Sequence, residues 1–357
     1  MKRASTSSQS SEASAWAEAS GSPVNRVVDF FPLSVSPRIA NPVNHRNIME
    51  WSFDTLRIDE ETGGKSLSFV TSAVLDFNCN LLSGRPEMTA ALKRVMARAE
   101  TRYNTTPNVR YHNHIHGADV MQALHYFLRH SAFFDKLSVG RDPGLMMMAA
   151  MCAAGLHDID HVGLTNSFLV KSGHALAQEH GSTSVLEKHH AAIANSLLID
   201  FPFASRNERN EFLKIVTELI LATDLSRHHQ MVSSPPVVGE GIESLCFLLH
   251  AADVSNNGRV REVSVQWTER LMEEFFHQGD LERELQIGVT PMMDRSVCNV
   301  ARVQIGFIDV IARPLYVALC GLVDGLEHIV ELMDANRAAW VAEALAVDPP
   351  CVEDDCN

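Results

Sequence analysis

The chain has 357 residues, of which 46% are hydrophobic, and its formal net charge at pH 7 is −14. The apolar content suffices for one large core or two closely fused domains, while the acidic charge argues against nucleic-acid binding and leaves a small phosphate ester as a possible ligand. The seven cysteines form no CxxC pair, which favours reduced thiols in a soluble, cytoplasmic protein over a disulfide framework.

The N-terminal part carries little helical signal. Residues 1–24 are rich in Ser and Ala and are expected to be a disordered linker, and no apolar run follows the basic start, so no signal peptide is expected. Residues 25–85, with prolines at 32, 37 and 42, are expected to form an extended N-terminal arm that packs on the core. The helical pattern begins at about Pro86, which stands where a first-turn proline would.

From residue 86 to residue 345, apolar residues recur at helical spacing, and few stretches alternate at period two. This pattern predicts an all-α protein, a compact multi-helix bundle, with one domain over 86–345 and an acidic tail over 346–357. The apolar run 145–156 is too short to span a bilayer and predicts a helix buried on all sides. Two prolines predict a loop over 231–241. The other expected helices cover 116–135, 143–157, 183–199, 207–222, 241–253, 260–278, 293–312 and 314–345.

Two histidine clusters carry the clearest chemical signal. The sequence YHNHIH spans residues 111–116 at the start of an expected helix, and HDIDH spans 157–161 at the end of the apolar helix. Within each cluster two histidines stand four residues apart, which would place them on one helical face. Imidazoles and carboxylates together suit zinc, manganese or magnesium, and polar residues ending an apolar helix are costly to bury without a ligand. The two clusters together therefore predict a divalent-metal site.

Each signal also has a simpler interpretation. One histidine-rich cluster alone is as easily a surface turn, and we interpret His189-His190 and His228-His229 in that way. Asp253, at the end of another apolar helix, could add a carboxylate ligand, although an aspartate in such a place is often only a cap.

Seven segments occur in the order found in class I cyclic-nucleotide phosphodiesterases, which are HD-type metal phosphohydrolases, and the chain resembles that family over about residues 86–345. The resemblance implies that a hydroxide bridging two metal ions at the bottom of a deep pocket hydrolyses 3′,5′-cyclic nucleotides to the 5′-monophosphate and so terminates their signalling. The segments are YHNHIHGADVMQ, HDIDHVGLTN, LEKHH, LATDLSRHH, HAADVSNN, WTERLMEEFFHQGD and VQIGFIDVIARPLY.

The resemblance also implies roles for individual residues. Four ligands would hold the tighter ion, zinc, and Asp158 would bridge to a second ion, magnesium or manganese. His112 would be the general acid that protonates the leaving 3′ oxygen, and Glu274 would orient its imidazole. The implied zinc ligands are His116, His157, Asp158 and Asp253, and the residues implied to order water on the second ion are His161, Glu187 and Thr223.

The implied base pocket centres on Gln304 and Phe307, which are three residues apart and share a helical face. The amide would bond a purine edge while the ring stacks on its face, with Leu271 as the opposite jaw and Tyr111 and Asn256 nearby. Asn256 points to cAMP, but a glutamine amide can present either polarity, so cGMP stays open. Without the resemblance, Phe307 and Leu271 would be interpreted as core residues.

Two other functions stay open at this point. Another HD-type phosphohydrolase would share the metal ligands but would not require the YHN segment, Gln304 and Phe307 together. A cyclic-nucleotide receptor that has lost turnover would be expected to lack a ligand or the acid, and all are present. Oligomeric state is not predicted.

Overall fold

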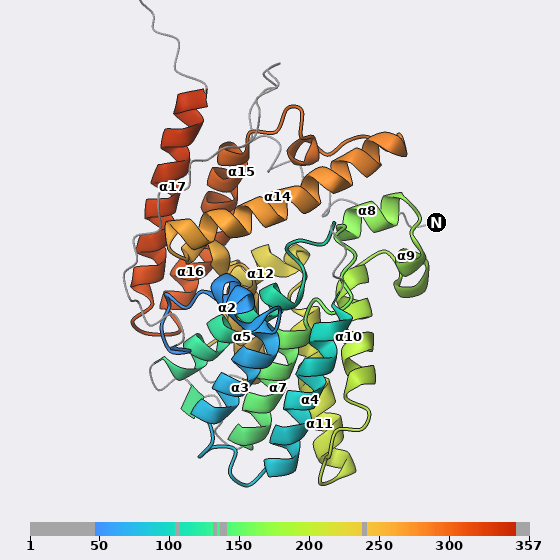
Figure 1. The fold of residues 1–357 in the computed structure, drawn as a ribbon, viewed down its shortest axis with the longest axis vertical. Helices are drawn as coiled ribbons and strands as arrows, with labels where there is room; N and C mark the ends of the chain where they lie inside the picture. The colour runs from blue at the N-terminus through green and yellow to red at the C-terminus, as the bar shows by residue number, and fades with distance from the viewer. Residues whose placement is uncertain (1–46, 104–107, 131–133, 136–140, 238–240, 348–357) are drawn as a thin grey trace, which may run out of the picture.

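The structure is a computed structural model that describes residues 47–103, 108–130, 134–135, 141–237 and 241–347 (Figure 1). Within these ranges all regular secondary structure is helical and no strand occurs, which confirms the predicted all-α class. The expected linker 1–24, the first part of the arm and nearly all of the acidic tail lie outside the described residues.

Most of the expected long helices form within a few residues of their predicted bounds. Three six-residue helices, α8, α9 and α12, were not predicted, because so short a segment carries little periodic signal. The helices are α2 (Thr55–Thr62), α3 (Ser66–Phe77), α4 (Pro86–Arg102), α5 (His114–Arg129), α7 (Pro143–Leu156), α8 (Asn166–Lys171), α9 (Ala175–His180), α10 (Val185–Leu197), α11 (Arg206–Leu221), α12 (His228–Ser233), α13 (Gly241–Asp253), α14 (Arg261–Glu284), α15 (Val300–Phe307), α16 (Arg313–Cys320) and α17 (Glu327–Val347), with 3-10 turns η1 (Leu225–Arg227), η2 (Ser255–Gly258) and η3 (Pro291–Met293) and a π turn η4 (Ile308–Ala312).

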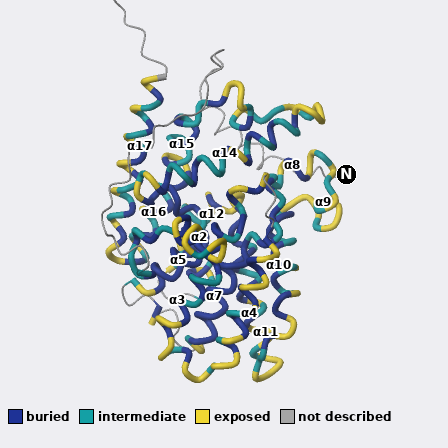
Figure 2. The backbone as a smooth tube through the Cα atoms, in the orientation of Figure 1, coloured by how far each residue is buried: buried dark blue, intermediate teal, exposed yellow. Residues whose placement is uncertain are grey.

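The core is organised around α7, which packs against α4, α5, α10, α11 and α13. Asp142 caps this helix by accepting the backbone N–H of Leu145 at 2.8 Å, and Pro143 occupies its first turn. Every residue from Gly144 to Leu156 is buried, as Figure 2 shows for the centre of the bundle. A helix that is apolar on all sides is stable only in such a place. The chain therefore leaves the core directly into His157.

The expected extended arm is wrong for the part of residues 25–85 that the structure describes. Helices α2 and α3 form there, and α3 packs against α4 and α5 in the core. Asp54 caps α2 by accepting the Arg57 N–H at 3.1 Å, and Gly63 ends it at a φ of 65°. The prolines that suggested an extended arm all precede residue 47, so they do not interrupt these helices.

The sequence analysis expected one helix to end at residue 312 and the next to begin at residue 314, and this boundary is also wrong. The helix runs without interruption from Val300 to Cys320, and the chain instead leaves helical structure at residues 321–326. The π turn η4 directly precedes the first turn of α16, which contains Pro314. Proline has no backbone N–H to donate, and a wider turn accommodates its ring without ending the helix.

This long helix is apolar enough to cross a membrane by length and composition, with a mean hydropathy of 1.5 in its most apolar window, and 44% of that window is buried inside the protein. Core helices of similar composition meet the same criterion, so the finding alone does not indicate a membrane protein. The expected absence of a membrane span stays a prediction.

Helix α14 is held to the segment that follows it by a very close backbone contact. A Cβ atom added at Gly279 would overlap with the carbonyl oxygen of Met293, so only glycine fits there. The buried carboxylate of Glu282 reinforces this contact by accepting the N–H of Thr290 at 2.6 Å and its hydroxyl at 2.9 Å. These contacts fix the path of the chain between α14 and α15.

We therefore predict that Gly279→Ala destabilises the protein by at least about 1–3 kcal/mol, the usual cost of overpacking, because the backbone at Met293 must move. Gly84→Ala is the matched control, since no heavy atom lies within 4 Å of its added Cβ and its φ is not in the left-handed region. Urea unfolding of both variants measures the difference. Equal stability of the two variants would contradict the contact.

Candidate metal centre

Three separate parts of the fold bring four potential metal ligands together. His116 lies in the first turn of α5, His157 and Asp158 directly follow α7, and Asp253 is the last residue of α13. Each offers one ligand atom, and these atoms all lie within 4.8 Å of one another. The four implied zinc ligands therefore converge in space although up to 137 residues separate them in the chain.

The chemistry of these donors fits a cation. Nε2 of His157 lies 3.1 Å from Oδ2 of Asp158 and 3.2 Å from Oδ1 of Asp253, and Nε2 of His116 lies 2.9 Å from the same Asp253 oxygen. Nδ1–H of His157 donates to the carbonyl of Ala154 at 2.8 Å, so Nε2 is the nitrogen that faces both carboxylates. Lone pairs at these distances repel unless a proton or a metal ion lies between them.

The side chains are electrostatically coupled. Burial opposes protonation of His157, but Asp158 and Asp253 outweigh it and raise the pKa of His157 well above its usual range. Burial likewise disfavours the charged carboxylates, but the His157 imidazole holds the pKa of Asp158 well below its usual range and also lowers the pKa of Asp253. The carboxylates are thus ionised and the site attracts positive charge.

His112 and Glu274 form a second group beside the first. One oxygen of Glu274 accepts the backbone N–H groups of Tyr111 and His112 at 2.6 and 2.9 Å, and the other accepts Nδ1–H of His112 at 2.6 Å. Burial would lower the pKa of His112, but the adjacent Glu274 carboxylate raises it to about 9. At neutral pH this imidazole therefore carries a proton that it can donate.

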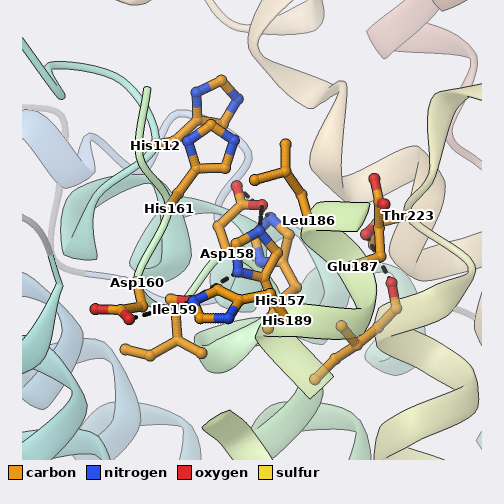
Figure 3. Close-up of polar contacts among 12 residues, drawn as sticks. His112, His157, Asp158, Ile159, Asp160, His161, Leu186, Glu187, His189 and Thr223 are labelled. Atoms are coloured by element: carbon orange, nitrogen blue, oxygen red, sulfur yellow. Dashed lines mark hydrogen bonds and ion pairs between the residues drawn. The ribbon is translucent and has the colours of Figure 1, made fainter. Parts of the chain in front are cut away.

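The expected pairing of histidines along helical faces is wrong. Helix α5 begins after His112, and α7 ends before His157, so neither pair lies within one helix. The rings that meet come from different clusters. The ring centroids of His116 and His157 are 5.1 Å apart. The rings of His112 and His161 are stacked with their centroids 4.1 Å apart, and Figure 3 shows these two rings side by side. The start of α5, the turn after α7 and the end of α13 create the site, and no single helical face does.

His161 is held as a neutral donor. Its Nδ1 accepts the backbone N–H of Gly163 at 2.9 Å, which leaves the proton on Nε2. Burial and the positive charge of the stacked His112 keep the pKa of His161 well below its ordinary value. Its ring nitrogen lies within 4.8 Å of ligand atoms of Asp158 and His190, so it faces the same side of Asp158 as His190.

The other two residues expected to order water lie on neighbouring elements. Glu187, in the first turn of α10, accepts Nδ2–H of Asn166 at 3.0–3.1 Å, and burial together with Asp224 raises the pKa of Glu187 to about 7. Thr223 is buried just after α11, and its hydroxyl donates to the Ile220 carbonyl at 2.8 Å. Figure 3 shows both on the side of Asp158 away from His112.

The interpretation of two histidine pairs as surface turns is wrong for His190 and His228, which are 1% and 4% exposed. Nδ1–H of His190 donates to the Ile159 carbonyl at 2.7 Å, while its buried Nε2 has no hydrogen-bond partner and lies 3.8 Å from Oδ1 of Asp158. His190 is therefore a site residue that the sequence analysis missed. Its position three residues after Glu187, on the same helical face, is the signal that would have identified it.

The residues expected to bind the base lie on three elements. Nδ2–H of Asn256 donates to the hydroxyl of Tyr111 at 3.0 Å, and the Tyr111 ring lies 4.5 Å from the ring of His116. Leu271 packs on the small apolar cluster that contains Tyr111. Gln304 is buried on α15 and Phe307 is partly buried at its end, directly before the π turn. Their binding roles and the depth of the pocket stay predictions.

The chain is similar to known cyclic-nucleotide phosphodiesterases in sequence and to a phosphodiesterase domain in fold. The sequence profile of the 3′5′-cyclic nucleotide phosphodiesterase family matches residues 111–333. The chain is 34% identical to a probable 3′,5′-cyclic-AMP phosphodiesterase pde-4 of Caenorhabditis elegans, over 86% of this chain and 48% of the relative, and 34% identical to the 3′,5′-cyclic-AMP phosphodiesterase 4C of Rattus norvegicus, over 84% and 59%. It thus spans about half the length of the curated relatives it matches.

Among solved structures, the phosphodiesterase domain of the RhoPDE fusion protein from the choanoflagellate Salpingoeca rosetta is similar in fold. The TM-score is 0.72 at 25% sequence identity, and the match covers 84% of this chain and 96% of that domain. The similarity therefore extends over almost all of a phosphodiesterase domain.

We predict that Asp253→Ala weakens zinc binding by more than about 100-fold. Mutation of a residue that only hydrogen-bonds to a metal ligand already lowers metal affinity by about 10–100-fold, and loss of a ligand should cost more. Asp309→Ala, which removes an exposed carboxylate paired with Arg337, is the control and should bind zinc as the wild type does. Competition with a chelator of known affinity measures both. Unchanged zinc affinity in Asp253→Ala would exclude these four residues as one metal site.

Proposed function

Because the chain belongs to the 3′5′-cyclic nucleotide phosphodiesterase family, we propose that it hydrolyses 3′,5′-cyclic nucleotides, with cAMP as a substrate, to the 5′-monophosphate and so ends their signalling. Both curated relatives described above are named as cAMP phosphodiesterases. The observation that carries the proposal is the His112–Glu274 pair beside the four clustered ligands. Such a site combines a proton donor with a place for divalent metal ions.

In this proposal His116, His157, Asp158 and Asp253 would hold zinc, and Asp158, whose Oδ1 lies 3.8 Å from Nε2 of His190, would also serve magnesium or manganese. Mixed imidazole and carboxylate donors suit the first ion, while a single carboxylate surrounded by polar side chains suits a largely hydrated second ion. When bound, two such ions polarise the phosphate and lower the pKa of an attacking water.

The side chain of His112 supplies the proton for the leaving 3′ oxygen. Because Glu274 occupies its Nδ1 at 2.6 Å, only Nε2 can reach a substrate. The same carboxylate keeps the ring charged before the transfer. It also holds the backbone on which the ring is mounted, through the N–H groups of residues 111 and 112. Glu274 therefore sets both the position and the charge of the acid.

The base selectivity proposed for the pocket rests on two amides. Asn256 is oriented by two neighbours, since it donates to Tyr111 and accepts from Asn257 at 2.8 Å. The Gln304 side chain is buried on α15, and no described neighbour is seen to orient its amide in the way that Asn257 orients Asn256. A glutamine amide can present either its carbonyl or its NH₂ group to a purine. This supports acceptance of cGMP in addition to cAMP, with Phe307 and Leu271 enclosing the base.

We also propose a cytoplasmic location. Five of the cysteines lie in the described part of the chain, and all five are free thiols. Burial raises the pKa of Cys152 well above its usual range and raises the pKa of Cys246 and of Cys298 to about 12, so these thiols are unreactive. Free thiols are typical of a reducing compartment.

The purified protein should convert cAMP to AMP, and a chelator should abolish the conversion until zinc and magnesium are restored. Chromatography of the nucleotides measures the product. His112→Ala should lower kcat by about 10²–10⁴-fold, the usual worth of a positioned general acid, with zinc content unchanged. If the wild type converts no cyclic nucleotide with both metals present, the proposed function is wrong.

Gln304→Ala should raise KM for cAMP and cGMP, since a buried purine edge loses a partner at a cost of about 1–3 kcal/mol. Phe307→Ala should weaken the binding of cAMP and of cGMP by the same factor, because stacking on the phenyl ring needs only the flat face of the base. Steady-state kinetics on both substrates separate the two effects. Unchanged KM values in Gln304→Ala would remove this residue from the pocket.

A further inference from the structure

Helix α2 touches the catalytic helix α5 at its first residue. Nε2–H of His114, the residue that opens α5, donates to Oδ1 of Asp59 at 3.0 Å. The same oxygen accepts the hydroxyl of Ser66 at 2.8 Å and its backbone N–H at 3.3 Å. One carboxylate oxygen thus joins the end of α2 and the start of α3 to the start of α5. A carboxylate is also favourable beside two helix N-termini.

The other end of α2 is attached to α5 one turn beyond His116. The hydroxyl of Thr55 donates to Oδ1 of Asp119 at 2.7 Å, and this oxygen also accepts from the buried guanidinium of Arg259 at 3.1 Å. Between the two attachments, Leu56 packs in one apolar cluster with Tyr111. Helix α2 is therefore attached to the first two turns of α5 at two residues one turn apart, Thr55 and Asp59.

The segment attached in this way carries the reacting groups. His112 lies two residues before His114, and His116 lies two residues after it. The same segment is also held by Glu274 on α14, and Arg270 of that helix donates to the carbonyl of the preceding Arg110 at 3.3 Å. Two helices far apart in the sequence, α2 and α14, thus hold this part of the chain.

We propose that α2 is a positioning element of the active site, in which Asp59, through His114, holds the start of α5 so that His112 and His116 keep their mutual orientation. This inference rests on the proposed function for its kinetic consequences. Helix α2 lies before residue 111, where the match to the family profile begins, so this attachment is a contribution of the flanking segment. Neither Asp59 nor His114 contacts a metal-ligand atom or His112. Both act through the backbone that joins His114 to His112 and to His116.

Three variants test the proposal. Asp59→Ala removes the acceptor and should lower kcat about 10-fold or more with KM changed less than about twofold, because a small misplacement of a reacting group costs rate. Asp59→Asn keeps an oxygen that can accept from His114 and Ser66 and should restore most of kcat. Glu60→Ala, on the exposed face of the same helix, should match the wild type.

Zinc content and unfolding midpoint are measured on the same samples. The proposal is supported if Asp59→Ala keeps its zinc and folds, loses kcat, and is rescued by Asp59→Asn. It is overturned if kcat in Asp59→Ala equals that of the wild type, if the loss follows loss of zinc, or if Asp59→Asn is as slow as Asp59→Ala.

A second measurement does not depend on catalysis. Hydrogen exchange of the backbone amides of residues 114–119 in the metal-loaded protein should be faster in Asp59→Ala than in wild type and Glu60→Ala. If the wild type hydrolyses no cyclic nucleotide, the proposed function fails, and this exchange still decides whether α2 holds α5. Equal exchange in all three proteins overturns the positioning role.

Discussion

Two carboxylates, Asp158 and Asp253, determine how the rest of the site is built. Each follows or ends an apolar helix, and burial of such groups is costly because their hydrating water is lost. The imidazoles of His116 and His157 approach them within 3.5 Å, and the His157 ring has its only fixed proton on the far nitrogen. Positive charge must therefore enter between these groups, and the surrounding helices hold the groups in place to receive it.

Sequence reasoning succeeded where the signal is local. The apolar run before His157 predicts a buried helix because no face of it could contact water, and the structure buries nearly all of it. Most of the long helices before residue 293 were predicted within a few residues, since apolar residues recur with the helical period. The implied metal ligands lie in short segments with dense polar residues that apolar helices carry to one place, and the structure brings those ligands together.

The parts that sequence reasoning missed depend on tertiary contacts. His190 lies in a polar segment that resembles a solvated helix surface, and it is buried where it contacts Ile159 and His161 in the turn after α7. The histidines spaced four apart suggested helical faces, although the helices stop at those residues. Helices α2 and α3 carry weak signals of their own, and contact with the core stabilises them. The π turn before Pro314 follows from how a continuous helix accommodates proline, which no spacing of apolar residues indicates.

Helix α14 has a consequence for how such a protein can diverge. Its 24 residues carry Glu274, which sets the acid, Leu271, which packs beside Tyr111, and Gly279, which admits no side chain because of Met293. A rigid helix transmits any tilt along its whole length, so a change that reshapes the contact at Leu271 also displaces the carboxylate behind His112. Under the proposed function, in which Leu271 encloses the base, substrate range and turnover would be inherited together along α14. Diversification of the proposed base pocket would be less constrained on α15, which contributes none of the four clustered metal-ligand candidates and neither member of the His112–Glu274 pair.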